Sequence, residues 1–145
     1  MFQLTVRSAL IPVLVCGIFC GCGGGGSNEK LQKVYPVNGV VKYQGQPVEG
    51  ATVTFTLGGE KSRTAFGKSG PNGEFKITTY KKDDGAVAGK HAVTVTKVET
   101  SEPDANGIVP PDKQLLPERY ADLGTTPLTA DITDKGPNTV ELNLE

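Results

Sequence analysis

Short runs in which apolar and polar residues alternate are the feature that most constrains this 145-residue chain. Val53 and Phe55 alternate with threonines in residues 52–57, and Val93 and Val95 alternate with threonines in the same way. Successive side chains of a β-strand point to opposite faces. The pattern therefore predicts strands with one buried face and with the threonines in water. Beyond the N-terminal segment, no apolar stripe has helical spacing over a useful length.

About seven strands are expected, separated by turn residues. Their ranges are 37–43, 52–57, 63–67, 74–78, 93–96, 128–132 and 140–144. The turns include Gln44-Gly45-Gln46-Pro47 and Gly70-Pro71-Asn72-Gly73, in which Asn-Gly readily adopts positive φ. Strands of this kind, without helices to cover a parallel sheet, predict an all-β antiparallel sandwich. The expected core residues are Val53, Phe55, Phe75, Val93, Val95 and Leu142.

The N-terminal segment predicts export and a lipid anchor. Arg7 is the only charged residue before Glu29, and the mostly apolar residues 8–19 are fewer than the roughly 20 that span a bilayer. Gly21-Cys22 follows and resembles a bacterial lipoprotein processing site, in which a small residue precedes the cysteine that is lipidated. Residues 1–21 are therefore expected to be a removed signal peptide, with Cys22 as the lipidation site. An ordinary secretory signal is the alternative.

The rest of the chain fits a tether followed by one domain. The glycines at 23–26 predict a flexible, lipidated tether over residues 22–34, and residues 35–145 have the length of a single domain. Acyl chains on Cys22 would hold the protein on a membrane. Gly23 is not the aspartate that retains many lipoproteins of two-membrane bacteria in the inner membrane. The outer membrane is therefore expected where one exists.

Composition excludes two further classes of protein. All three cysteines lie in the first 22 residues, so the exported domain is not a disulfide scaffold. Removing Arg7 with the signal peptide leaves 14 basic and 16 acidic residues, a formal charge of −2. The lysines are scattered along the sequence, so no nucleic-acid partner is expected.

Several motifs along the mature sequence carry a family likeness. They are VNGVV at 37–41, GQPVEGATVTF at 45–55, NGEF at 72–75, DGA at 84–86, GKHAV at 89–93 and LPERY at 116–120. These motifs resemble the carboxypeptidase regulatory-like domain family, and the last one, with Leu128 and Asn138, resembles its short lipoprotein branch. The resemblance implies a transthyretin-like seven-stranded sandwich that serves as a non-catalytic accessory or surface domain. Gly70 and His91 depart from the family pattern, which has aspartate and an aromatic residue there.

Few residues offer catalytic or metal chemistry, and no catalytic, cofactor or metal site is predicted. His91 is the only histidine, and its parity with Val93 predicts a buried structural residue rather than a base. One histidine and one lipidated cysteine do not make a zinc site. Calcium would need loop oxygens without EF-hand spacing, and these are expected to stay solvated. Those side chains are Asp83, Asp84, Asp104, Asn106 and Asp112.

Two special chemistries, hydroxyisourate hydrolysis and an isopeptide crosslink, are not expected. Among transthyretin relatives, hydroxyisourate hydrolases use several histidines and a terminal Tyr-Arg-Gly-Ser, whereas this chain reads Asn143-Leu144-Glu145. An isopeptide crosslink between Lys42 and Asn138 would need a buried acid such as Glu74. Alternation places Lys42 and Glu74 outward instead.

Residues 99–115 form the one long segment that strand pairing does not explain. The segment is rich in Pro, Asp and Asn, and loops of this length are usually functional or disordered. Its apolar residues Ile108, Val109 and Leu115, with Leu116, are expected either to pack over a sheet edge or to present a contact. A mobile insertion is the alternative.

These observations predict a lipid-anchored cell-envelope protein whose non-catalytic sandwich is a surface binding or structural module. An envelope protein or a glycan is the expected partner. A carbohydrate-binding module is the first alternative, and it would stack sugars on Tyr35, Tyr43, Tyr80 or Tyr120, because the chain has no tryptophan. An uncharacterised hydrolase is the second alternative, and the missing nucleophile and base count against it.

Overall fold

The computed structural model describes residues 31–59 and 62–145. Its contacts group Leu31–Glu145 into one compact unit. The predicted signal peptide, Cys22 and most of the predicted tether lie outside the described residues. Within the described ranges the chain forms twelve strand segments and one 3-10 helix, and no α-helix. No helix in these ranges is long and apolar enough to cross a bilayer.

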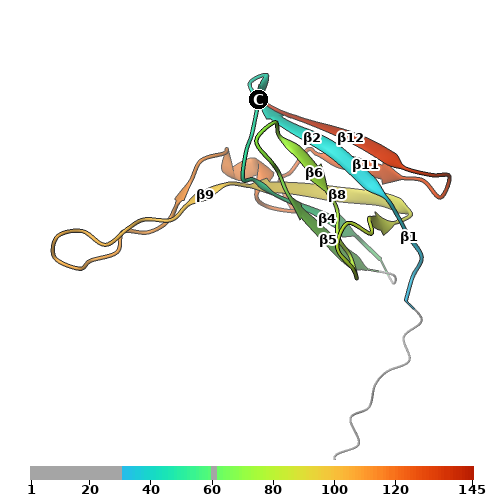
Figure 1. The fold of residues 1–145 in the computed structure, drawn as a ribbon, viewed down its shortest axis with the longest axis horizontal. Helices are drawn as coiled ribbons and strands as arrows, with labels where there is room; N and C mark the ends of the chain where they lie inside the picture. The colour runs from blue at the N-terminus through green and yellow to red at the C-terminus, as the bar shows by residue number, and fades with distance from the viewer. Residues whose placement is uncertain (1–30, 60–61) are drawn as a thin grey trace, which may run out of the picture. The chain divides into compact units, whose positions relative to one another are not determined.

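Two four-stranded sheets make up most of the unit (Figure 1). The first sheet is antiparallel throughout, in the order β11 (Thr129–Ile132), β8 (Gly89–Thr96), β4 (Thr52–Leu57), β5 (Arg63–Lys68). The second sheet is built around β2 (Val37–Tyr43). This strand pairs on one side with β12 (Asn138–Leu144) and also pairs with β3 (Gln46–Pro47) and β6 (Glu74–Lys76).

Two short strand pairs and the 3-10 helix complete the unit. The pairs are β1 (Val34–Tyr35) with β7 (Ala86–Val87), and β9 (Val98–Glu99) with β10 (Lys113–Gln114). The 3-10 helix η1 spans Glu118–Tyr120. Each of the seven predicted strand ranges overlaps one of the segments of three or more residues, and the five additional segments have two residues each. In the pair of β1 with β7, Val34 lies beside Val87 and Tyr35 beside Ala86.

One strand pair corrects the prediction of a purely antiparallel sandwich. β12 runs parallel to β2 along its whole length, from Asn138 beside Val37 to Leu144 beside Tyr43. Antiparallel neighbours are favoured where a short hairpin joins two strands. Here the first and last long strands meet after almost the entire domain has intervened, so no hairpin fixes their relative direction.

The hydrophobic core lies between the two sheets and confirms the predicted inward residues. The six predicted core side chains are at most 3% exposed. Phe55 from the first sheet and Phe75 from the second are in contact, with ring centroids 6.3 Å apart. Alternation therefore gave the correct buried face on both sheets.

The outer face of the first sheet differs from the prediction, because its threonines are not all in water. Thr94 is only 9% exposed, although it points away from the core. η1 and the residues after it cover this face, and Leu123 lines a shallow hollow with Thr54 and Thr94. The Tyr120 hydroxyl accepts a hydrogen bond from the Glu145 backbone N–H at 2.9 Å, which ties this cover to the end of β12.

The long segment at residues 98–115, which we call the arm, is an extended ribbon rather than a flap over the sheet edge. β9 and β10 pair at its base, and the ribbon projects away from the two sheets (Figure 1). Ile108 and Val109 are 64% and 57% exposed. Leu116, just beyond the arm, is buried in the core. Ile108 and Val109 at the tip of the arm therefore do not pack over the sheet edge, which was one of the two expectations for these apolar residues.

Candidate binding groove

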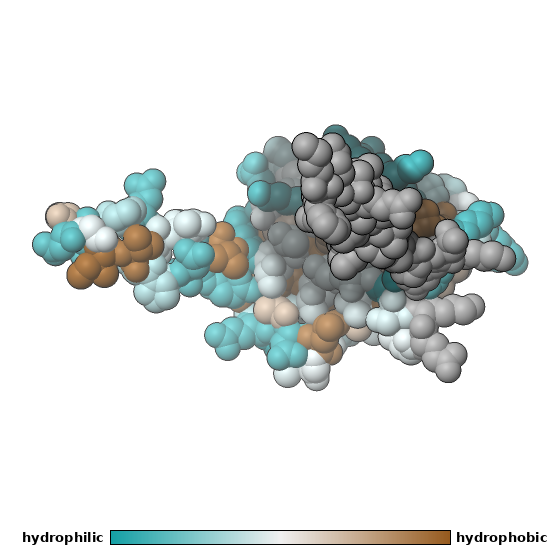
Figure 2. Space-filling view, turned by 90° about the horizontal axis from the view of Figure 1, so that it is seen from below, coloured by the Kyte–Doolittle hydropathy of each residue, from teal (hydrophilic) through white to brown (hydrophobic). Residues whose placement is uncertain are grey.

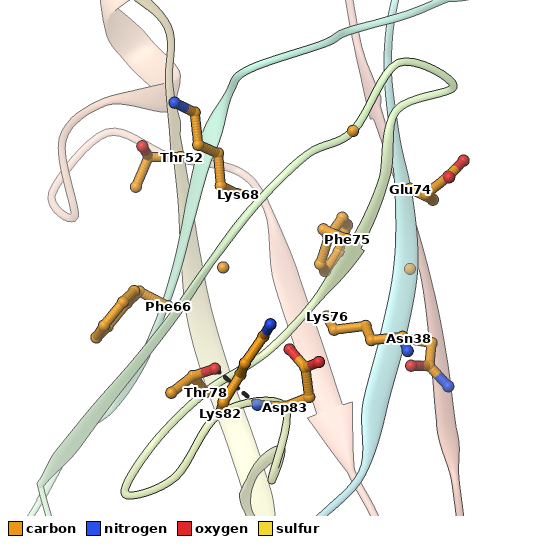
Figure 3. Close-up of a pocket in the computed structure, with 13 residues that line it drawn as sticks. Asn38, Thr52, Phe66, Lys68, Glu74, Phe75, Lys76, Thr78, Lys82 and Asp83 are labelled. Atoms are coloured by element: carbon orange, nitrogen blue, oxygen red, sulfur yellow. Dashed lines mark hydrogen bonds between the residues drawn. The ribbon is translucent and has the colours of Figure 1, made fainter.

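A cavity of about 840 Å³ lies where β5 and the chain around β6 pass beside one another. We call it the β5–β6 groove. Its lining includes Asn38, Phe66, Lys68, Phe75, Lys76 and Lys82. Figure 3 shows these side chains coming from both sheets and from the loop after β6. Its volume is in the range of about 300–1,000 Å³ typical of ligand pockets.

Glycines at the groove allow neighbouring strands and the Phe75 ring to approach closely. A Cβ atom at Gly67 on β5 would collide with the Lys76 carbonyl oxygen of β6, and a Cβ atom at Gly39 on β2 would collide with the Phe75 ring. The backbone N–H and carbonyl groups of Phe66 on β5 bond to Thr78, two residues after the end of β6, at 3.0 and 2.8 Å. The groove therefore has a floor made largely of backbone and of the Phe75 ring.

Phe66 is the exposed aromatic residue of the groove. It is 57% exposed on β5, on the opposite side of the strand from buried Ala65. A large aromatic residue would ordinarily be assigned to the core. The close passage of β6 instead requires small inward residues on β5, which places Phe66 outward. Sequence reasoning missed Phe66 as a site residue; its alternation with Ala65 and Gly67 is the signal that was available.

The rim of the groove carries charged side chains that form no ion pair among the described residues. Lys68, Lys76 and Lys82 supply three ammonium groups, and Glu74 and Asp83 supply two carboxylates. The one salt bridge in the described part of the chain joins Lys42 to Glu141 at 2.8 Å, away from this rim. In Figure 3 the Lys82 side chain extends upward between β5 and β6, whereas the Glu74 carboxylate points away from the middle of the groove. The accessible charge is therefore mainly positive.

His91 is buried in the core, as predicted, and lies outside the groove. It is 1% exposed, with its ring centroid 5.8 Å from that of Phe55. Its Nε2 atom is 2.8 Å from the Val87 carbonyl oxygen, so Nε2 carries the proton and donates it. Nδ1 has no hydrogen-bond partner within the described residues. His91 also contributes to the lining of a second, smaller cavity, beside Gly58 and Leu123.

The acidic residues weighed as calcium ligands lie in two separate loops. Asp84 accepts hydrogen bonds from the backbone N–H groups of Thr79, Tyr80 and Lys81, which organises the loop after β6. Asp104 accepts bonds from Asn106 and Ile108 at the tip of the arm. Asp112 accepts one from the Ser101 N–H, farther along the arm. In residues 31–59 and 62–145, no group of three or more metal-ligating side chains comes together.

Backbone hydrogen bonds also determine the charge state of these two aspartates. Partial burial acts to raise the pKa of Asp84, but the N–H groups of Thr79, Lys81 and Tyr80 together outweigh it and lower that pKa. For Asp104, the N–H groups of Ile108 and Asn106 lower the pKa. Both side chains are therefore strongly anionic at neutral pH.

The proposed sugar-stacking tyrosines do not gather at the groove. Tyr120 is buried, and the other three are partly buried. The Tyr80 hydroxyl accepts a hydrogen bond from the Gln32 N–H at 3.3 Å, so it helps to hold the start of the domain. None of the four tyrosines lines the groove, where Phe66 and Phe75 are the aromatic residues.

The residues considered for an isopeptide crosslink are also separated. Lys42 lies beside Asn143 in the pairing of β2 with β12, whereas Asn138 lies at the other end of that pair beside Val37. The Asn138 side chain accepts a hydrogen bond from the Thr133 N–H at 2.9 Å and closes the turn before β12. Glu74 is exposed.

No family model, no curated protein and no solved structure matches the chain.

Proposed function

We propose that this protein is an exported, lipid-anchored binding module of the cell envelope, without catalytic activity, and that the β5–β6 groove is its binding surface. The observation that carries the proposal is the groove itself, which combines an exposed aromatic ring with three lysines that have no ion pair among the described residues. Such a surface offers apolar contact and charge recognition together.

The fold proposed for this module is the transthyretin-like sandwich of carboxypeptidase regulatory-like domains. The motifs quoted from the sequence support it, as does a core shared by two sheets. Cys22, following Gly21 and the short apolar run, supports the lipid anchor. The glycine tether would then let the module sample positions above the membrane surface, outer or inner.

Two measurements test the anchor and the groove separately. Cys22→Ala should move the protein from the membrane to the soluble fraction and abolish an acyl mass on the mature chain. Membrane attachment that persists without any acyl mass on the wild type would contradict the anchor. For the groove, Lys82→Glu should reduce capture of envelope components by the immobilised protein, whereas Lys81→Glu, the same charge change at an exposed neighbour outside the groove, should leave capture unchanged.

Glycan binding is a second candidate function, favoured by Phe66. The groove combines an exposed ring, a flat apolar platform, with the hydrogen-bonding groups of the Asn38 amide and the Thr52 hydroxyl. A glycan array probed with the wild type and with Phe66→Ala distinguishes this candidate. Signals that disappear in the variant would favour glycan binding, and a blank array for the wild type would exclude the glycans tested.

A further inference from the structure

The arm and the β5–β6 groove are oppositely charged surfaces of the same chain. Residues 98–115 contain four carboxylates and one lysine, Lys113. The carboxylates are those of Glu99, Glu102, Asp104 and Asp112, and all four residues are exposed. The groove rim has three lysines against two acids. Opposite net charge on two exposed surfaces favours their association.

Both surfaces also expose apolar side chains. Ile108 and Val109 at the arm tip are 64% and 57% exposed, and Phe66 at the groove is 57% exposed. Figure 2 shows apolar side chains gathered on the projecting arm, at the left of the view. Burying such groups against one another removes apolar area from water, which is favourable. Contact between the arm tip and the groove would therefore bury apolar area from both surfaces.

The arm is organised to present its tip. The Asp104 side chain accepts hydrogen bonds from the Asn106 and Ile108 N–H groups, and the Asp104 N–H donates to the Ile108 carbonyl oxygen at 2.9 Å. These bonds close the tip into a turn. A turn that is already formed loses less conformational entropy on binding than a disordered loop does. In Figure 1 the arm projects away from its own sheets, so its tip is available to another molecule.

We propose that the arm of one copy of this protein docks in the β5–β6 groove of a second copy. Ile108 and Val109 contact Phe66 in this arrangement, and the arm carboxylates face Lys68, Lys76 and Lys82. The two contacting surfaces differ, so the contact is head-to-tail and propagates into a ring or a chain of copies. This inference rests on the proposed function, because it names the partner of the same groove. On a membrane, lipid anchoring would raise the local concentration of copies and favour the contact.

Complementation between two variants tests the proposal. The arm variant is Ile108→Ser with Val109→Ser, and the groove variant is Phe66→Ala with Lys82→Glu. Full-length chains in mild detergent, carrying two different tags, are compared by co-purification and sedimentation velocity. The wild type should form oligomers, and each variant alone should lose at least tenfold in self-association affinity. Mixed together, the two variants should form a complex that stops at one copy of each, because only one arm and one groove remain intact.

Matched controls separate docking from general surface effects. Lys81→Glu repeats the charge change outside the groove, and Leu31→Ser removes an exposed apolar residue outside the arm. Both controls should associate like the wild type, and 1 M salt should weaken wild-type association because it screens exposed charges. Circular dichroism of each variant checks that the fold is retained.

Three results would overturn the docking proposal. They are a monomeric wild type at all concentrations tested, unchanged self-association in both variants, and a mixture of variants that does not associate. The docking proposal can fail while the binding-module proposal survives, and a groove that binds neither a second copy nor an envelope component contradicts both. A monomeric wild type whose groove still captures an envelope component sensitive to Lys82→Glu removes the second copy as partner and leaves the binding function in place.

Discussion

The sandwich and the arm use apolar residues in opposite ways. In the sandwich, Val53, Phe55 and Val95 are fully buried between two sheets, whereas Ile108 and Val109 in the arm are more than half exposed. Buried apolar area is the main favourable term in folding, so the sandwich residues determine stability. The arm tip contributes little buried area within one copy. Its apolar residues therefore need an explanation outside the stability of the sandwich, and contact with another molecule provides one.

The largest expected effect tests the sandwich side of this comparison. Phe55→Ala should lower the free energy of unfolding by about 3–5 kcal/mol, because it loses burial and leaves a cavity between the sheets. Thr52→Ala, on the exposed face of the same strand, should change it by about 0.5 kcal/mol or less. Denaturant titration of both variants measures the difference. Equal midpoints would mean that the assignment of faces on β4 is wrong.

A smaller loss of stability is expected for a substitution at Gly39, which lies in the second sheet and lines the groove. In Gly39→Ala, the new Cβ collides with the Phe75 ring and with the Val140 carbonyl oxygen, so overpacking should cost about 1–3 kcal/mol. Gly58→Ala is the matched control, since a Cβ there meets nothing within 4 Å and no positive φ is required. Thermal unfolding of the two variants separates crowding from the general effect of replacing glycine. Similar melting temperatures would contradict the close approach at Gly39.

Features that depend on a local sequence pattern could be predicted, whereas features that depend on distant segments coming together could not. Alternation identifies the core because burial on one face of a strand is a local pattern that a single sequence displays. The parallel pairing of β12 with β2 is a long-range choice, and no short turn in the sequence encodes it. The burial of Thr94 is of the same kind, since it depends on where η1 and the residues after it pack. The position of the groove escaped prediction because it arises where two segments pass each other.

Asp84 is expected to make a pH-dependent contribution of intermediate size to the free energy of unfolding. Its pKa is lower in the folded protein than the ordinary aspartate value of about 3.9, because backbone hydrogen bonds outweigh partial burial. A lowered folded pKa contributes stability that is present above the ordinary value and is lost as the pH falls through the folded pKa. Asp84→Ala should therefore destabilise the protein by about 1–2 kcal/mol at pH 7, through lost hydrogen bonds, and by less at pH 2.

The control for this prediction is Asp83→Ala, which changes the exposed neighbouring acid. The Asp83 carboxylate accepts no backbone hydrogen bond in the described structure, so its removal should leave the pH dependence of unfolding close to that of the wild type. Urea unfolding at pH 7, 4 and 2 gives the comparison. A constant gap between Asp84→Ala and the wild type at all three pH values would rule out the assigned role of the carboxylate.

The smallest expected change in the free energy of unfolding is that caused by shortening the arm. This deletion tests whether the arm serves contact with another copy and not stability. Deleting residues 101–109 removes the exposed tip and leaves Thr100, Pro110, Pro111 and Asp112 between β9 and β10, a loop length that hairpins commonly use. Shortening the loop lowers its closure entropy cost by about 1 kcal/mol, which offsets part of the lost hydrogen bonds at Asp104 and Ser101. The free energy of unfolding should therefore stay within about 1 kcal/mol of the wild-type value, while self-association should disappear. Collapse of the fold would instead show that the arm packs as a structural element, and unchanged self-association would place the contact elsewhere on the sandwich.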